Sequence, residues 1–207
     1  MIIERIKLLR KKFIINKIDG YIIPKNDEFF GEYSNHDRLK AISNFDGSAG
    51  LAIVLKDKNY LFVDGRYTIQ AKKQSGKNFK IVEIHKFLPY KIIKNLNIGF
   101  DPALFTQRQL KIYFNNKITL KPISKNLIDE IYKKKKSISK PFFSLNKKIT
   151  GEGHTSKIKK IIKIMNKYKA DYIFVSAPEN VAWLLNIRGH DNPNSPIPNC
   201  RMILSRK

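Results

Sequence analysis

The hydrophobic and polar positions in the first half of the chain alternate between helical patterns and short apolar runs typical of strands. Residues 2–17 repeat apolar side chains at helical spacing, with Lys and Arg between them. Two apolar runs, 50–55 and 60–63, flank the polar segment 56–59, which predicts a β-hairpin. Further strands are predicted at 21–23, 79–84 and 98–100, and further helices at 36–44, 66–74, 88–96 and 106–115. This mixture predicts an α/β domain with a mixed sheet flanked by helices on both faces.

A second, shorter unit follows a segment with the composition of a linker. Four lysines at 133–136 precede a stretch with two serines that ends at Pro141, and a run of like charge followed by Ser and Pro is typical of a domain boundary. The alternative for the lysine run is a nuclear-localisation or heparin-type patch. We predict a first domain over residues 1–140, a linker over 141–150 and a second unit over 151–207.

The second unit repeats the opening order of the first. A helix capped by Thr155 or Ser156 leads through Asp171 to an apolar strand at 172–175, then to a Pro-containing loop, another helix and an apolar run at 202–204. This order predicts an incomplete second copy of the first α/β unit, because about 55 residues bury too little surface to stand as a domain. We expect strands 172–175 and 202–204 to lack their normal neighbours, and unpaired apolar edges tend to aggregate.

The charge of the chain is strongly positive, with a formal net charge of +24 at pH 7. Only eight of the 41 basic residues are Arg, the residue that binds phosphates and bases bidentately. Lys, Ile and Asn, which are abundant here, share AT-rich codons, so biased base composition accounts for the charge. A nucleic-acid partner is therefore disfavoured, although a basic surface binds polyanions weakly at low salt.

Cysteine content and hydropathy bear on the compartment. The one cysteine, Cys200, excludes an internal disulfide and a Cys-based zinc site, and it fits a reducing cytosol. Charges interrupt every apolar run of the N-terminal segment, which is unlike a signal peptide. No run approaches the roughly 18–20 apolar residues of a membrane span. The basic amphipathic helix at 2–17 has an anionic membrane surface as its alternative partner, but its apolar stripe is more typical of a core-facing helix.

The sequence carries no recognisable catalytic pattern. The four histidines, at 36, 85, 154 and 190, are far apart and lack the spacing of metal ligands, so each is expected to be a solvated loop residue. Acidic residues are scarce and do not form the set that a two-metal hydrolase needs. No nucleophile elbow or phosphate-binding loop is present.

Three short segments near the ends of predicted elements stand out: Glu32, 46–50 and 64–67. Arg66 follows Asp64 and Gly65 just past a strand, where it is well placed to meet a carboxylate or a peptide carbonyl. The structural alternative is that Asp64 caps the following helix and Arg66 pairs with a local acid. Gly47 and Gly50 allow a tight turn into the strand. Asp46, Gly47, Gly50, Asp64, Gly65 and Tyr67 are therefore candidate structural positions of these motifs.

These segments resemble one family in order and separation. Asp-Gly-Tyr-Ile-Ile-Pro at 19–24, Gly-Glu-Tyr at 31–33, Phe-Asp-Gly-Ser-Ala-Gly at 45–50 and Val-Asp-Gly-Arg-Tyr-Thr at 63–68 look like the opening of the long, three-domain Xaa-Pro aminopeptidases. Ala-Pro-Glu-Asn-Val-Ala-Trp-Leu-Leu-Asn at 177–186 continues the resemblance.

The resemblance implies a fold and an activity. Two related α/β domains of the creatinase/prolidase N-terminal type precede a C-terminal pita-bread domain, which holds two Mn²⁺ ions and removes the N-terminal residue that precedes proline in a peptide. It further implies that Arg66 contacts the bound peptide and that Glu32 supports activity. No metal ligand of that family has a counterpart in these 207 residues, so the chain is expected to be a cytoplasmic N-terminal fragment, inactive alone.

Two alternatives stay open. The chain is half of a split aminopeptidase that a separate catalytic chain completes, or it is a standalone basic module that binds peptides or polyanions. A second copy of the chain, in a homodimer, is the alternative to a separate catalytic chain as partner, and no membrane partner is expected.

Overall fold

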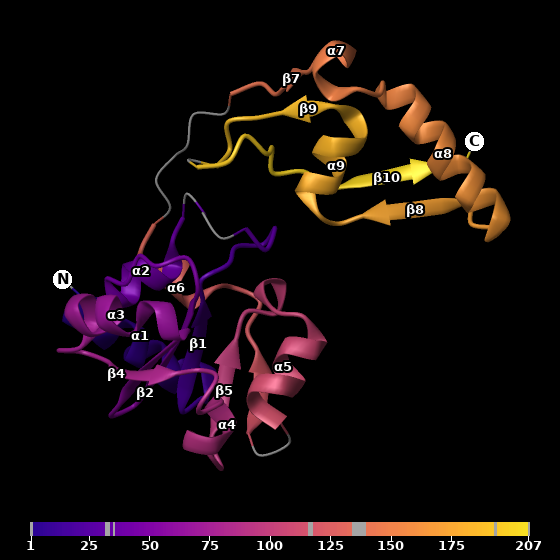
Figure 1. The fold of residues 1–207 in the computed structure, drawn as a ribbon. Coiled ribbons are helices and arrows are strands. Elements are labelled where there is room, and N and C mark those ends of the chain that lie inside the picture. The colour runs from indigo at the N-terminus through magenta and orange to yellow at the C-terminus, as the bar shows by residue number, and fades with distance from the viewer. Residues whose placement is uncertain are drawn as a thin grey trace. The chain divides into compact units, whose positions relative to one another are not determined.

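The computed structural model describes residues 2–31, 34, 36–115, 118–133, 140–192 and 194–206. The chain forms two compact units (Figure 1). The first contains residues 1–28 and 36–135, and the second contains residues 29–35 and 136–207. The part of the predicted linker signal at 134–139 lies outside the described residues.

The first unit is built on a six-stranded sheet in the order β4-β3-β2-β1-β5-β6. Only β2 runs opposite to the other strands, because it pairs antiparallel with β1 and β3 while the remaining neighbours are parallel. The predicted β-hairpin is therefore confirmed as β2 and β3. The strands are β1 (Gly20–Pro24), β2 (Gly50–Leu55), β3 (Asn59–Val63), β4 (Lys80–Glu83), β5 (Asn97–Phe100) and β6 (Thr119–Pro122).

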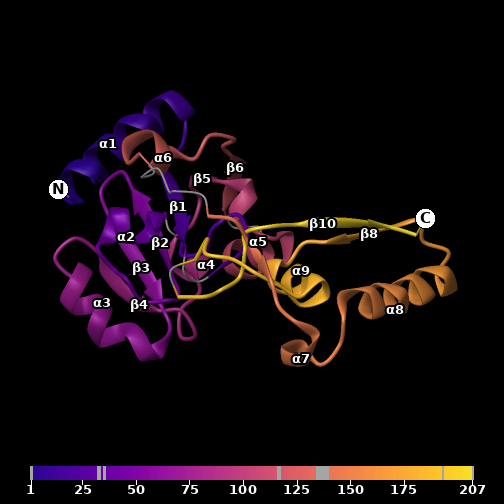
Figure 2. The same cartoon turned by 90° about the horizontal axis from the view of Figure 1, so that it is seen from above.

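Helices cover both faces of this sheet, as predicted. The first face packs against α1 (Ile2–Asn16), α2 (Arg38–Ser43), α3 (Thr68–Ser75) and α6 (Leu127–Ile131). The second face packs against α4 (Pro89–Ile92) and α5 (Gln107–Phe114), and Figures 1 and 2 show α5 on the side of the sheet away from α1. Two 3₁₀ segments complete the unit, η1 (Gly65–Tyr67) and η2 (Pro102–Leu104).

Alternation along β1 divides the core between the two faces. Tyr21 and Ile23 belong to the cluster under α1 and α2, whereas Ile22 belongs to the cluster under α5. Each fully buried aliphatic or aromatic side chain contributes about 1.5–3 kcal/mol through removal from water. Since both faces are buried, the strand reads as a continuous apolar run in the sequence.

Three short elements of the first unit differ from the sequence-based prediction. The helix predicted over 88–96 is limited to α4, because Ile93 turns to extended backbone and is buried in the core. β6 and α6 were not predicted. β6 carries Lys and ends in Pro, so it lacks an apolar alternation, and α6 has five residues, too few to show a helical period.

The second unit contains two small antiparallel pairs, β8 with β10 and β7 with β9. Residues 141–150, which we predicted as a linker, contain β7 and α7. The elements are β7 (Phe143–Ser144), α7 (Lys147–Thr150), α8 (His154–Lys167), β8 (Tyr172–Val175), α9 (Pro178–Leu185), β9 (Ile187–Arg188) and β10 (Met202–Ser205).

The second unit repeats the local geometry of the first at the junction of helix and strand. After α1, Ile18 N donates to Phe13 O at 3.0 Å, and after α8, Ala170 N donates to Met165 O at 2.9 Å. The preceding residue has a positive φ in both units, 50° at Lys17 and 53° at Lys169. The predicted repeat of element order is therefore confirmed, and it extends to backbone conformation.

The strand pairs of the two units are closed by equivalent ion pairs. Asp19 precedes β1 and pairs with Lys56, which follows β2, at 2.5 Å. Asp171 precedes β8 and pairs with Arg206, which follows β10. In both units an acidic residue before the first strand therefore meets a basic residue after its antiparallel neighbour.

The burial of the repeated strands differs between the units. β1 is buried along its whole length, whereas Tyr172 and Phe174 of β8 are 69% and 61% exposed and Ile203 of β10 is 69% exposed. β8 and β10, which were expected to lack neighbours, pair with each other. Among the described residues neither has a strand on its other edge.

Candidate functional site

The two glycine-containing motifs of the first unit come together at one end of the sheet. The hydroxyl groups of Ser48 and Tyr67 are hydrogen-bonded at 2.9 Å. The Asp46 carboxylate accepts hydrogen bonds from the side-chain amides of Gln70 at 2.8 Å and Gln74 at 2.7 Å, both on α3. These bonds, with that of Gln74 first, help hold the pKa of Asp46 below its ordinary value. The loop before β2 is thus tied to the segment after β3.

Phe45 explains why glycine occupies position 47. A Cβ on Gly47 would lie 2.3 Å from Cζ of the buried Phe45 ring, closer than any real contact. The same ring meets Tyr67 edge-on, with 5.7 Å between ring centroids. A Cβ on Gly50 would lie 3.0 Å from a Leu39 methyl group, which is also tight. The two glycines therefore let the loop pass close over the aromatic pair.

Arg66 projects from η1, immediately after β3. Asp64 caps this 3₁₀ segment by accepting the Arg66 backbone N–H at 2.9 Å, and it also accepts the Arg66 guanidinium through Nε at 3.0 Å and Nη2 at 2.7 Å. The hydrogen bonds from Arg66 lower the pKa of Asp64. The Arg66 side chain is 74% exposed, so its charge lies at the surface, oriented by Asp64.

The structure shows the purely structural role predicted as the alternative for these two residues: Asp64 caps η1 and pairs with Arg66. An exposed guanidinium has five N–H donors, more than the two that Asp64 accepts, so it can also bind a carboxylate or carbonyl. Gly65 has no steric requirement, since the nearest atom to a Cβ there is Glu83 Oε1 at 3.6 Å. Glu32 lies outside the described residues.

Two buried basic side chains, Arg38 and His36, form a charge cluster with partly exposed acids, and no local sequence pattern indicated it. Arg38, which is 6% exposed, donates to both carboxylate oxygens of Asp129, at 2.7 and 2.8 Å, and to Glu28 at 2.5 Å. His36 Nε2 lies 2.7 Å from the same Asp129 carboxylate, and its ring stacks on Tyr132. The prediction that His36 is solvated is therefore wrong, because α6 supplies it with a carboxylate partner.

Hydrogen bonding outweighs burial for the acids of this cluster. Burial alone would raise the pKa of Asp129, but hydrogen bonds from Arg38 and His36 hold it below its ordinary value. The pKa of Glu28 is lowered in the same way by Arg38. Burial alone would lower the pKa of the Arg38 guanidinium, and its two carboxylate partners raise it instead. All three groups are thus charged at neutral pH.

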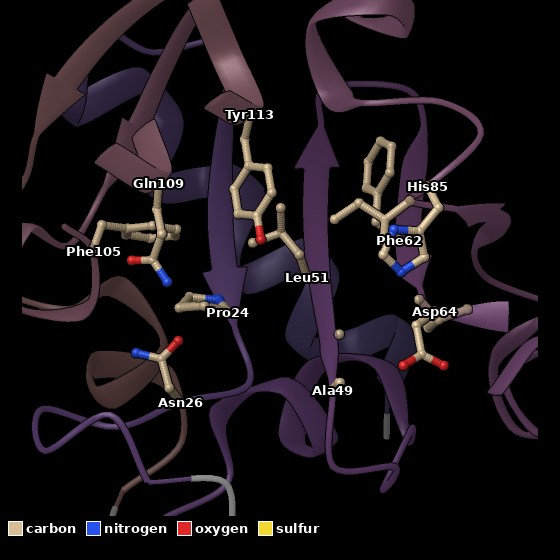
Figure 3. Close-up of a pocket in the computed structure, with 13 residues that line it drawn as sticks. Pro24, Asn26, Ala49, Leu51, Phe62, Asp64, His85, Phe105, Gln109 and Tyr113 are labelled. Atoms are coloured by element: carbon tan, nitrogen blue, oxygen red, sulfur yellow. The ribbon is translucent and has the colours of Figure 1, made fainter. Parts of the chain in front are cut away.

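A pocket of about 250 Å³ opens at the carboxyl ends of β1 and β3 (Figure 3). Its apolar wall consists mainly of Leu51, Phe62 and Phe105, and Figure 3 shows polar side chains of Asn26, Gln109, Tyr113 and His85 around it. Asp64 also borders it, which places the pocket beside the Arg66 motif. Local sequence patterns could not reveal it, because its lining residues come from segments up to 89 residues apart, from Pro24 to Tyr113.

Within the ranges that the structure describes, no three side chains of His, Cys, Asp or Glu come together to hold a metal ion. No helix in those same ranges combines the length and the apolar character needed to cross a membrane.

Comparison with known proteins gives the family. Residues 5–131 match the creatinase/prolidase N-terminal domain, and residues 133–207 match a second domain family with the same description. The chain therefore belongs to the creatinase/prolidase N-terminal domain family.

The curated proteins that are similar to this chain are Xaa-Pro aminopeptidases. A probable Xaa-Pro aminopeptidase P from Laccaria bicolor is 35% identical over 94% of this chain and 33% of its own length. Xaa-Pro aminopeptidase 1 from Dictyostelium discoideum is 32% identical over 94% of this chain and 35% of its length. The chain thus spans about a third of the length of the curated relatives it matches.

A solved structure matches the whole chain. The X-prolyl aminopeptidase of Caenorhabditis elegans, described as a cytosolic enzyme with a di-nuclear active site, has a TM-score of 0.85 and 25% identity over 100% of this chain and 38% of its own. The residues described in the present structure do not form such a dinuclear centre, since they bring no three ligating side chains together.

Proposed function

We propose that this chain is the peptide-positioning N-terminal part of a metal-dependent Xaa-Pro aminopeptidase. The observation that carries the proposal is the continuous likeness through both units: 94% of the chain matches curated Xaa-Pro aminopeptidases at 31–35% identity. In this proposal the substrate is a peptide with proline at its second position, and the 207 residues do not cleave it alone.

Arg66 is the residue proposed to contact the peptide. Its guanidinium is exposed, and Asp64 holds it by two hydrogen bonds while also capping η1, so the donor group is oriented before a ligand arrives. A guanidinium has five N–H donors, more than the two that Asp64 accepts, and can bind a peptide carboxylate or carbonyl oxygen. Glu32 is proposed as a second contributor, on the resemblance of the Gly-Glu-Tyr motif at 31–33 to the family.

The metal ions of the proposed enzyme would be held by residues outside this chain. Bound metal ions polarise a carbonyl and lower the pKa of a coordinated water. Two Mn²⁺ ions are proposed, and a metal requirement is supported by the di-nuclear active site described for the C. elegans relative. A cytoplasmic location belongs to the same proposal, supported by the description of that relative as cytosolic.

The test is complementation. The 207-residue chain is assayed with Mn²⁺ and an Xaa-Pro-Yaa peptide, alone and joined to the remaining two thirds of the L. bicolor relative. We expect release of the N-terminal residue only from the joined protein. Arg66→Ala should reduce kcat/KM of the joined protein about 10- to 100-fold, the value of one or two charge-assisted hydrogen bonds.

Arg108→Ala is the matched control, because Arg108 is also an exposed arginine of the first unit and its loss changes the net charge equally. It should leave kcat/KM within about twofold. Cleavage by the 207 residues alone, or a joined protein whose activity is the same with and without Arg66, would contradict the proposal.

A further inference from the structure

The pocket of Figure 3 lies where an α/β sheet most often binds ligands. β1 and β5 are adjacent parallel strands, and the chain leaves them toward opposite faces: β1 leads to α2 in one core cluster and β5 leads to α5 at the other. Crevices at the carboxyl ends of strands that diverge in this way are the usual binding sites of open α/β sheets. Asn26 follows β1 and Gln109 belongs to α5, so the pocket spans this divergence.

Two side-chain amides are fixed by backbone bonds and present opposite halves to the pocket. Gln109 Oε1 accepts from Thr106 N at 2.8 Å and from Thr106 Oγ1 at 3.1 Å. Because an N–H can bond only to the oxygen, the Gln109 NH₂ group must point away, and Figure 3 shows it directed into the pocket. Gln109 Nε2 has no hydrogen-bond partner in the part of the chain that the structure describes.

Asn26 is fixed in the opposite sense. Its Nδ2 donates to Leu104 O at 2.9 Å and to Asp27 O at 3.2 Å, and a carbonyl can only accept. Asn26 Oδ1 is therefore left as an acceptor beside the pocket (Figure 3), with no donor among the described residues. Together the pair offers one donor and one acceptor, the complement of the backbone of one residue, which has one C=O and one N–H.

The remaining walls determine what else the ligand must contain. Leu51, Phe62 and Phe105 are buried and apolar, and they would enclose an aliphatic or aromatic side chain. The one carboxylate on the rim, Asp64, is already bonded to Arg66. The pocket volume of about 250 Å³ is smaller than the roughly 300–1,000 Å³ of sites that bind drug-sized ligands. A volume of this size fits one or two amino-acid residues.

We propose that this pocket binds one apolar residue of a neutral peptide, whose backbone C=O accepts from Gln109 and whose backbone N–H donates to Asn26. The inference rests on the proposed function only in taking a peptide as the natural source of that residue. Binding here requires neither a metal ion nor cleavage.

The test is titration of the ¹⁵N-labelled 207-residue chain with N-acetyl-L-leucinamide, followed by NMR chemical shifts. We expect saturable shifts at the side-chain amides of Asn26 and Gln109 and at the backbone of residues 49–51, with a dissociation constant on the order of millimolar. Saturable shifts confined to other residues, or none at all, would overturn the proposal.

Gln109→Glu is the decisive variant. A Glu at this position keeps the oxygen that accepts from Thr106, so the capping box of α5 survives, but it replaces the NH₂ donor with a second acceptor. Affinity for the probe should fall about tenfold or more, since the ligand carbonyl loses its donor and meets a carboxylate. Gln107→Glu, two residues earlier on the same helix and outside the pocket lining, introduces the same charge and should leave affinity unchanged. Equal affinity of the Gln109→Glu variant and the unaltered chain would refute the assigned hydrogen bond.

The two proposals fail separately. A joined protein that cleaves Xaa-Pro peptides through Arg66 while the probe does not bind would remove the pocket assignment alone. A probe that binds through Gln109 while the joined protein stays inactive would leave the pocket in place and remove the aminopeptidase proposal.

Discussion

Arg38 and Asp129 face each other across 91 residues of sequence, with Nε and Nη2 of the guanidinium bonded to the two oxygens of one carboxylate. This pair joins α2 to α6, and it also holds Glu28 and His36, because Glu28 accepts from Arg38 and His36 bonds to Asp129. Through Asp129, α6 therefore helps to hold α2 in place.

Removing the cation should destabilise the first unit. Arg38→Met keeps most of the side-chain volume but removes the guanidinium that Asp129 and Glu28 share. Breaking a fully buried pair costs roughly 3–5 kcal/mol. Because Asp129 and Glu28 are each about 40% exposed, we expect a smaller loss, about 2–3 kcal/mol. Urea denaturation measures it, with Arg108→Met, which should change stability by less than about 0.5 kcal/mol, as control.

The same cluster predicts a pH dependence of stability. The pKa values of Asp129 and Glu28 are lowered in the folded state, so the unfolded chain binds more protons as the pH falls. The stability they contribute is fully present above the ordinary carboxyl pKa of about 4 and is lost as the pH falls through the folded values.

Urea midpoints measured from pH 6 to pH 3 should therefore decline, and the decline should be shallower in Asp129→Asn, which removes one titrating group. Parallel declines in the two proteins would show that this carboxylate does not carry the effect.

Gly47 should tolerate no side chain. Gly47→Ala places a methyl group against the Phe45 ring and should cost about 1–3 kcal/mol, as overpacking typically does. Combining it with Phe45→Leu should cost less than the sum of the two single changes, because the smaller side chain relieves the clash. Gly65→Ala is the control and should stay within about 0.5 kcal/mol, since its Cβ has room. Additive costs in the double variant would contradict the steric explanation.

The exposed pair of strands in the second unit should promote self-association. Ile203 and Phe174 are cross-strand neighbours, and both are largely exposed. Ile203→Lys should lower concentration-dependent association of the chain in sedimentation velocity, and removal of the residues after 145 should do the same. Ile149→Lys, on α7 outside this strand pair, adds the same charge at an exposed position and should have less effect. Equal effects of the two lysine variants would assign the change to net charge instead.

Local patterns in the sequence were sufficient for most elements of the fold. The hairpin β2–β3, the core helix α1 and the repeat of the first unit in the second were predicted, because apolar periodicity and turn residues act between near neighbours. The predicted helix cap at Thr155 or Ser156 was wrong, because α8 begins at His154, after Gly153. The likeness of the motifs around Asp46 and Arg66 to one family was also visible in the sequence. Elements of four or five residues, such as β6 and α6, are too short to show a period and were missed.

The sequence by itself determined the α/β class, the order of most elements and the family. The tertiary structure alone decided which strands are neighbours, that His36 and Arg38 are buried against Asp129, and that Asn26 and Gln109 border one pocket. The physical reason is the sequence separation of the residues that interact. Hydrogen bonds within turns and helices depend on adjacent residues, whereas a bond between residues 91 positions apart forms only after the sheet has brought α2 and α6 together.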